Sequence, residues 1–220
     1  MNVIGPTSIA TAVAHQMRIH LFQGSFEPGE VLKDTALAEQ FGVARGTVRA
    51  AIQQLEAEGL LVRLPGHSAR VPEFEALDIV DLYRVRLPIE WAAVESVVRR
   101  NLDLDLVQTA FEEMEKARSQ DRAQLVSADL AFHRALVVSS GSTRLLQFFD
   151  QISGETQLMM AMLQTHYDHV DDLIEEHREL LEQLKRGNLK SCRAAWNEHF
   201  HSALVALNAI PDGGDDGLFF

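Results

Sequence analysis

One aspartate and three histidines of this 220-residue chain have spacings at which they can bind a metal ion. Asp129 and His133 are four residues apart, so on a helix both side chains emerge on one face and can chelate the same ion. His177 lies ten residues before Gly187, and His199 lies twelve residues after it. If Gly187 turns a helical hairpin, a rise of about 1.5 Å per residue places both histidines about 15–18 Å from the loop. The four side chains therefore predict a nitrogen and oxygen site for Zn²⁺, Ni²⁺ or a similar divalent metal.

A second group of side chains, in the first third of the chain, can read DNA. A short helix is predicted from Asp34, which can cap it, to Phe41, and a three-residue turn leads to a second helix that begins at Arg45. In a helix-turn-helix the second helix enters the major groove with its N-terminal residues against base edges. Arg45 and Arg49 share one face there and can each bind guanine through two hydrogen bonds, while Thr47 can bind a phosphate or a base.

The residues after these helices predict a small wing. Residues 60–71 have the pattern of a hairpin whose turn is Pro65-Gly66-His67-Ser68. Such a wing lies beside the minor groove, where the backbone of Gly66 can approach closely. His67 or Arg70 can then bind phosphates or base edges, although His67 is as readily an ordinary turn residue.

The distribution of Gly and Pro divides the chain into two parts. Both punctuate the first third, whereas from about residue 77 to 210 they occur only as Pro88, Gly141, Gly154 and Gly187, a pattern that predicts long helices. Helices are predicted near 9–22, 77–100, 103–118, 122–140, 142–166, 168–187 and 189–209. The fold is predicted to be mainly α, with a winged helix-turn-helix in 1–72, a linker in 73–76, a bundle of about six helices in 77–210 and a flexible acidic tail in 211–220.

Composition and charge exclude several classes of protein. Hydrophobic residues make up 46% of the chain, which excludes a disordered or fibrous protein. The single cysteine, Cys192, cannot form an internal disulfide, and no stretch is apolar enough for a membrane span, so a cytoplasmic location is expected. The net charge is −12, but bases and acids balance, six against six, up to Pro72. A neutral first third and an acidic remainder predict two different tasks.

Three segments of the N-terminal part closely resemble the winged-helix domain of GntR-family bacterial transcription regulators. They are Phe26–Leu32, Leu37–Arg49 and Leu55–Leu61, and the resemblance covers about residues 8–72. Ala44, Gly46 and Thr47 depart from the family's commonest turn, Val-Ser-Arg-Thr-Pro-Val-Arg, while both arginines are present. Asp34-Thr35 stands where the family usually has Glu followed by Arg or another polar residue. The resemblance implies a homodimer that binds palindromic operator DNA.

The C-terminal part resembles the FCD domain, the all-helical ligand-binding partner in one GntR subfamily. The segments that carry the resemblance are 78–90, Asp129–His133, His177–Leu181 and His199, and it covers about residues 77–205. It implies an effector cavity in which a metal, and often a basic residue, holds a small carboxylate. Arg86 is the candidate for that basic residue; its alternative role is a salt bridge with Glu90, one helical turn later.

These patterns predict a ligand-responsive transcription regulator, with repression as the expected mode, that has DNA and a small carboxylate as partners and no membrane contact. A metal sensor whose effector is the ion itself shares every motif. A metal-dependent hydrolase is the alternative from another class. No motif places a separate Glu or Asp as its general base, and a helix-turn-helix would then have no role.

Overall fold

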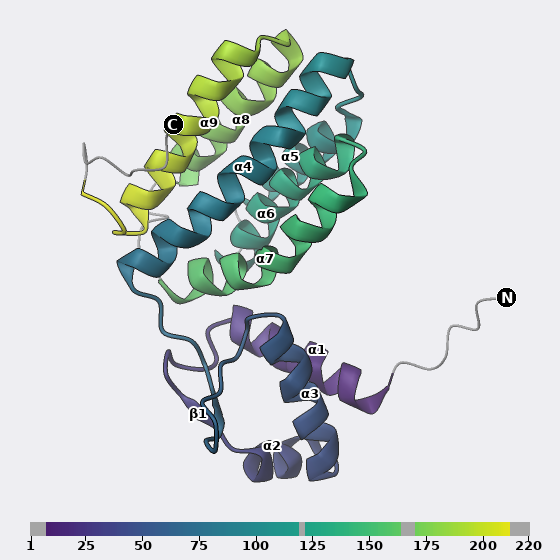
Figure 1. Ribbon diagram of the computed structural model, residues 1–220, viewed down its shortest axis with the longest axis vertical. Coiled ribbons are helices and arrows are strands. Elements are labelled where there is room, and N and C mark those ends of the chain that lie inside the picture. Colours follow the sequence, from purple (N-terminus) through teal and green to yellow (C-terminus); the bar gives the residue numbers. More distant parts are fainter. Residues whose placement is uncertain (1–7, 119–121, 164–169, 212–220) are drawn as a thin grey trace, which may run out of the picture. The chain divides into compact units, whose positions relative to one another are not determined.

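The structure is a computed structural model that describes residues 8–118, 122–163 and 170–211 (Figure 1). The chain divides into two compact units, one ending at Glu73 and one beginning at Phe74. The predicted tail from residue 212 on, and residues 164–169, where one predicted helix ends and the next begins, lie outside the described residues. In the part of the chain that the structure describes, no helix is both long and apolar enough to cross a membrane.

The N-terminal unit is a three-helix winged helix-turn-helix, as predicted. Its elements are α1 (Ile9–Phe22), β1 (Val31–Leu32), α2 (Asp34–Phe41), α3 (Arg45–Ala57) and β2 (Ala69–Arg70). Gly42 ends α2 in the left-handed conformation, with φ of 63°, which a glycine adopts without steric cost. Val48, Ile52 and Leu55 of α3 are buried, as their helical spacing predicts, and α3 packs against α1.

The wing differs from the predicted simple hairpin. Val62 and Arg70 form an isolated bridge, in which each N–H donates to the other's carbonyl at 2.9 and 2.8 Å. On its other edge β2 pairs antiparallel with β1, for which the sequence predicts no strand. The difference has a simple cause: Val31-Leu32 is a strand of two residues, too short to show the alternation by which strands are recognised. Gly66 turns the chain between the bridged residues with φ of 78°.

The C-terminal unit is a bundle of six helices over its described residues, and its helices begin and end within a few residues of the predicted positions wherever both ends are described. They are α4 (Ala76–Arg100), α5 (Asp105–Ala117), α6 (Arg122–Ser139), α7 (Thr143–Met162), α8 (Val170–Arg186) and α9 (Leu189–Ala206). Gly187, with φ of 67°, ends α8, and Asn188 caps α9 by accepting hydrogen bonds from two backbone N–H groups. Helices α8 and α9 therefore form the predicted antiparallel hairpin, which lies beside α4 in Figure 1.

The core of this bundle is mostly aromatic and aliphatic, but it also contains a cluster of charged and imidazole side chains. Tyr83, Phe132, Trp196 and Phe200 are among its largest fully buried side chains. In the same interior lie six ionisable side chains that are at most 5% exposed: Arg86, Glu90, Asp129, His133, His177 and His199. Buried groups of this kind are costly unless they are paired, so their contacts identify the site.

Candidate functional site

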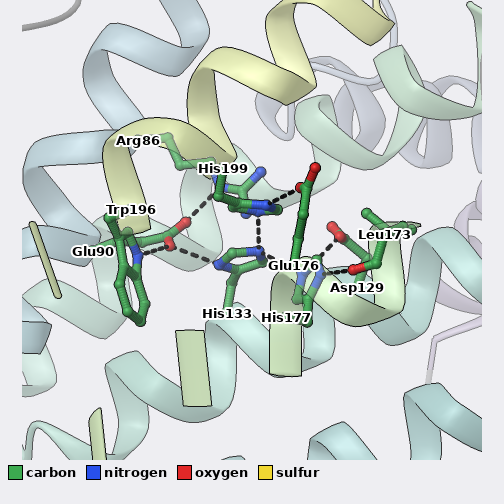
Figure 2. Close-up of polar contacts among 9 residues, drawn as sticks. All are labelled: Arg86, Glu90, Asp129, His133, Leu173, Glu176, His177, Trp196 and His199. Atoms are coloured by element: carbon green, nitrogen blue, oxygen red, sulfur yellow. Dashed lines mark hydrogen bonds and ion pairs between the residues drawn. The ribbon is translucent and has the colours of Figure 1, made fainter. Parts of the chain in front are cut away.

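The structure brings the four predicted metal ligands to one point inside the bundle. Asp129 and His133 come from one face of α6, His177 from α8 and His199 from α9, and one ligand atom of each lies within 4.8 Å of all the others. The Nε2 atom of His177 is 3.1 Å from both the Oδ1 atom of Asp129 and the Nε2 atom of His133. The Nε2 atom of His199 is 3.3 Å from that of His133 (Figure 2).

Each histidine ring is oriented by a hydrogen bond at its Nδ1 atom, on the side of the ring away from the cluster. This atom lies 2.7 Å from the Glu90 carboxylate in His133, 2.8 Å from the carbonyl of Leu173 in His177, and 2.8 Å from the Glu176 carboxylate in His199. A carbonyl and an ionised carboxylate can only accept, so each Nδ1 atom carries the hydrogen. The three Nε2 lone pairs therefore face the centre of the cluster.

This arrangement of donors fits a divalent metal. Three imidazole lone pairs and a carboxylate oxygen that converge at 3.1–3.3 Å repel one another unless a cation or a proton lies between them. Neutral histidines that donate their other N–H to a carboxylate or carbonyl are the usual ligands of Zn²⁺ and similar ions. Burial lowers the pKa of His133 to about 4, although Glu90 opposes this shift, so the ring is neutral at pH 7.

A second layer of contacts fixes the carboxylates that hold the rings. Glu90 accepts hydrogen bonds from the Nε atom of Arg86 at 2.6 Å and from the indole of Trp196 at 3.1 Å. Burial alone would raise the pKa of Glu90, but the Arg86 charge and the bonds from His133 and Trp196 lower it to about 2. Glu176 accepts a hydrogen bond from the hydroxyl of Ser202 at 2.6 Å. Both carboxylates are thereby oriented before any ligand binds.

Sequence reasoning missed the roles of Glu90, Glu176 and Trp196 at this site. Glu90 was considered only as a partner of Arg86, and the structure contains that salt bridge, with both side chains buried. One terminal nitrogen of Arg86 is also buried and has no hydrogen-bond partner among the described residues. The Arg86 guanidinium lies over the rings of Tyr83 and Phe200. The signal that could have revealed the role of Glu90 is its position on the buried face of α4, where a charged side chain needs partners.

The support from Glu176 leads to a prediction. Glu176→Gln keeps the shape of the side chain but replaces a charged acceptor of the His199 N–H with a neutral amide, and should weaken Zn²⁺ or Ni²⁺ binding by about 10–100-fold. Competition against a chromogenic chelator measures the affinity. The matched control is Glu175→Gln, since Glu175 is exposed and pairs with Arg178 instead. Equal affinities for the two variants would contradict the supporting role of Glu176.

The predicted DNA-reading residues lie on the surface of the N-terminal unit. The side chains of Arg45 and Arg49, in the first turns of α3, are 56% and 60% exposed, and Thr47 is half-buried. Arg49, Gly66 and His67 line one hollow of about 440 Å³, together with Arg63, which the sequence analysis did not single out. This hollow separates the start of the second helix from the turn of the wing.

Arg70 and Asp34 differ from the simplest expectation. Arg70 is half-buried in β2, and its Nε atom is buried with no hydrogen-bond partner among the described residues. Asp34 does not cap α2, because it is the first helical residue and Lys33 occupies the capping position. Its carboxylate instead binds Arg45 and Arg49.

Comparisons with known proteins agree with this architecture. Residues 9–71 match the family model described as bacterial regulatory proteins, gntR family, and residues 81–202 match the FCD domain. The HTH-type transcriptional regulator LutR of Bacillus subtilis is 31% identical over 80% of this chain and 90% of its own length. The gluconate operon transcriptional repressor of Bacillus licheniformis is 25% identical over 81% of this chain and 76% of its own. A solved GntR structure from Rhodococcus sp. RHA1 superimposes with a TM-score of 0.81, at 24% identity, over 90% and 97% of the two chains.

A winged helix-turn-helix followed by an all-helical FCD domain defines a DNA-binding transcription regulator with two domains. The chain belongs to the GntR family of bacterial transcription regulators and carries an FCD domain. It is accordingly a regulator and not an enzyme, which removes the hydrolase alternative.

Proposed function

We propose that this regulator is a cytoplasmic, ligand-responsive repressor that binds a palindromic operator as a homodimer through residues 1–72. Residues 77–210 sense a small carboxylate with the help of a divalent metal, Zn²⁺ or Ni²⁺. The observation that carries the proposal is the buried cluster of Asp129, His133, His177 and His199, which lies in the unit that does not read DNA. Repression is supported by the name of the gluconate operon relative.

The proposed DNA contacts follow from the geometry of α3 and the wing. Arg45, Thr47 and Arg49 stand at the N-terminal end of α3, where side chains of a recognition helix meet base edges. Gly66 and His67 form the exposed turn of the wing, and Arg70 follows them in β2, so all three are assigned to the minor groove and its phosphates.

Two observations support a homodimer. Residues 1–72, which are proposed to bind DNA, have as many acids as bases, so one copy neutralises few phosphates and two copies bind far more strongly. The adjacent helices α4 and α7 also expose three large apolar side chains: Leu77 is 79%, Val85 is 48% and Phe148 is 59% exposed. A second copy that packs against these side chains would bury them.

The effector is proposed to bind beside the metal cluster at Arg86. When bound, the metal supplies positive charge and open coordination positions for carboxylate oxygens. Arg86 donates its Nε hydrogen to Glu90 and retains a buried terminal nitrogen that can hold an anionic oxygen. A small hydroxy- or dicarboxylic acid matches these positively charged groups, in a domain that is otherwise acidic.

Isothermal titration with a panel of small hydroxy- and dicarboxylic acids tests the proposal. Metal-loaded protein is expected to bind at least one of them with micromolar to millimolar affinity, whereas metal-stripped protein should not. Arg86→Ala should weaken binding of the acid. Arg86→Lys is the control for unfolding, because it keeps a positive charge beside Glu90 but lacks the planar guanidinium. Equal binding by loaded and stripped protein would leave the metal as a structural link between helices.

The metal itself is the alternative effector. The same buried cluster favours it, because a site that depends on a divalent ion can report the supply of that ion. Operator affinity measured with and without Zn²⁺ or Ni²⁺, and with no carboxylate present, separates the two functions. A change caused by the metal alone would favour the metal sensor.

A further inference from the structure

Asp34 binds both arginines that are proposed to read DNA. It is the first residue of α2, and its Oδ2 atom accepts a hydrogen bond from the Nε atom of Arg49 at 2.6 Å. A terminal nitrogen of Arg45 donates to its Oδ1 atom at 3.2 Å and lies 3.5 Å from its Oδ2 atom. The Asp34 side chain is 23% exposed, against 56% and 60% for the two arginines. The carboxylate thus lies beneath two exposed guanidinium groups at the start of α3.

The hydrogen bonds to Asp34 leave each arginine with two nitrogens that can donate hydrogen bonds to a base. Arg49 gives Asp34 only its Nε hydrogen, so both terminal nitrogens have no hydrogen-bond partner among the described residues and can bind a base. Arg45 gives one terminal nitrogen and keeps the other and its Nε hydrogen. Because an arginine reads guanine through two nitrogens in one plane, fixing the rest of the guanidinium also fixes the direction of that plane. A free arginine would lose much more rotamer freedom on binding.

The charge of Asp34 opposes binding to DNA in general. The hydrogen bond from Arg49 lowers the pKa of Asp34, against a smaller effect of burial, and Arg45 lowers it further, so the group is ionised at neutral pH. A carboxylate at a DNA-facing surface repels phosphates of any sequence. The same group therefore reduces unspecific attraction while it favours the geometry of base reading.

We propose that Asp34 is a positioning residue that orients Arg45 and Arg49 for base reading, and that it sets how strongly this regulator distinguishes its operator from other DNA. The inference rests on the proposed function, in which these arginines contact base edges. Loss of Asp34 is therefore expected to reduce the discrimination between sequences, while the affinity for unspecific DNA stays constant or rises.

The experiment compares two DNA duplexes. One is a duplex that the full-length wild-type protein has selected from a randomised library, and the other has the same composition in permuted order. Fluorescence anisotropy at several salt concentrations gives both affinities. In Asp34→Asn the affinity for the selected duplex should fall about 10-fold, the size of one weakened bidentate contact, while that for the permuted duplex stays constant or rises.

Two further variants make the result specific to position and charge. Asp34→Glu keeps the carboxylate and should restore at least part of the discrimination. Glu39→Gln removes one negative charge from an exposed position of the same helix and should leave the ratio of the two affinities unchanged. Thermal unfolding of each variant shows that α2 still packs.

Several outcomes would overturn the inference. If Asp34→Asn binds both duplexes more tightly by the same factor, the group acts only through its charge. An unchanged ratio in Asp34→Asn, together with a loss of discrimination in Arg49→Ala, would reject the role of Asp34 and leave the proposed function intact. If the wild-type protein enriches no sequence from the library, the proposed reading of DNA and this inference both fail.

Discussion

Protein in which His177 is replaced by alanine is expected to bind Zn²⁺ or Ni²⁺ more than about 100-fold less tightly than the wild type, because even residues that only support a ligand contribute about 10–100-fold. His177 is central to the cluster, since its Nε2 atom lies 3.1 Å from both Asp129 and His133. The measurement is metal content after dialysis, together with chelator competition. Wild-type protein should also gain about 2.7 kcal/mol of unfolding free energy at a metal concentration 100 times the Kd, and His177→Ala should gain almost none at that concentration.

His201→Ala is the control for this result. His201 lies two residues after His199 on α9 and is not among the four clustered ligands, so its removal should leave the metal content unchanged. His199→Ala should behave like His177→Ala. If all three variants retain or lose the metal together, the proposed set of ligands is wrong.

The second large effect is expected on DNA. Replacing Arg45 or Arg49 with alanine should cost about 1–3 kcal/mol on a duplex selected by the protein and much less on a permuted duplex, because a bidentate contact to guanine is lost only on the former. The double variant should lose most of the discrimination. Anisotropy titrations at one fixed salt concentration measure the affinities of the wild type and of each variant for both duplexes.

Arg99→Ala is a matched control, because it removes the same charge from a surface pair with Glu95 on α4. It should leave both affinities close to those of the wild type. Equal losses on the two duplexes in the Arg45 and Arg49 variants would make these residues phosphate contacts. Undisturbed binding by the double variant would exclude α3 as the reading element.

Much of the architecture was predictable because it depends on local signals. Gly141 and Gly187 adopt φ of 72° and 67°, which side chains rarely tolerate, so the glycines that interrupt long apolar periodicity also mark the ends of helices. The proximity of His177 and His199 followed from their similar distances, ten and twelve residues, on either side of Gly187. The position of Asp129 and His133 on one face of α6 followed from their spacing of four residues, about one turn of helix.

What escaped prediction depends on contacts between residues far apart in the chain. Glu90 supports His133 across 43 residues and Glu176 supports His199 across 23, and no local spacing encodes such a pairing. The β1 strand is similar, since two residues become a strand only when β2 lies beside them. Asp34 was interpreted as a helix cap from its residue type, whereas the two arginines that bind it come from the following helix.

The position of Glu90 has a thermodynamic consequence for the proposed sensor. Its carboxylate accepts hydrogen bonds from Arg86 and His133 at once, so the arginine assigned to the carboxylate ligand and the histidine assigned to the metal share one acceptor. An anion that competes for Arg86 makes Glu90 a stronger acceptor for His133, and the ring becomes a better metal ligand. Linkage requires reciprocity: the factor by which the carboxylate tightens metal binding equals the factor by which the metal tightens carboxylate binding. The carboxylate and the metal then bind cooperatively, and each raises the apparent affinity of the domain for the other.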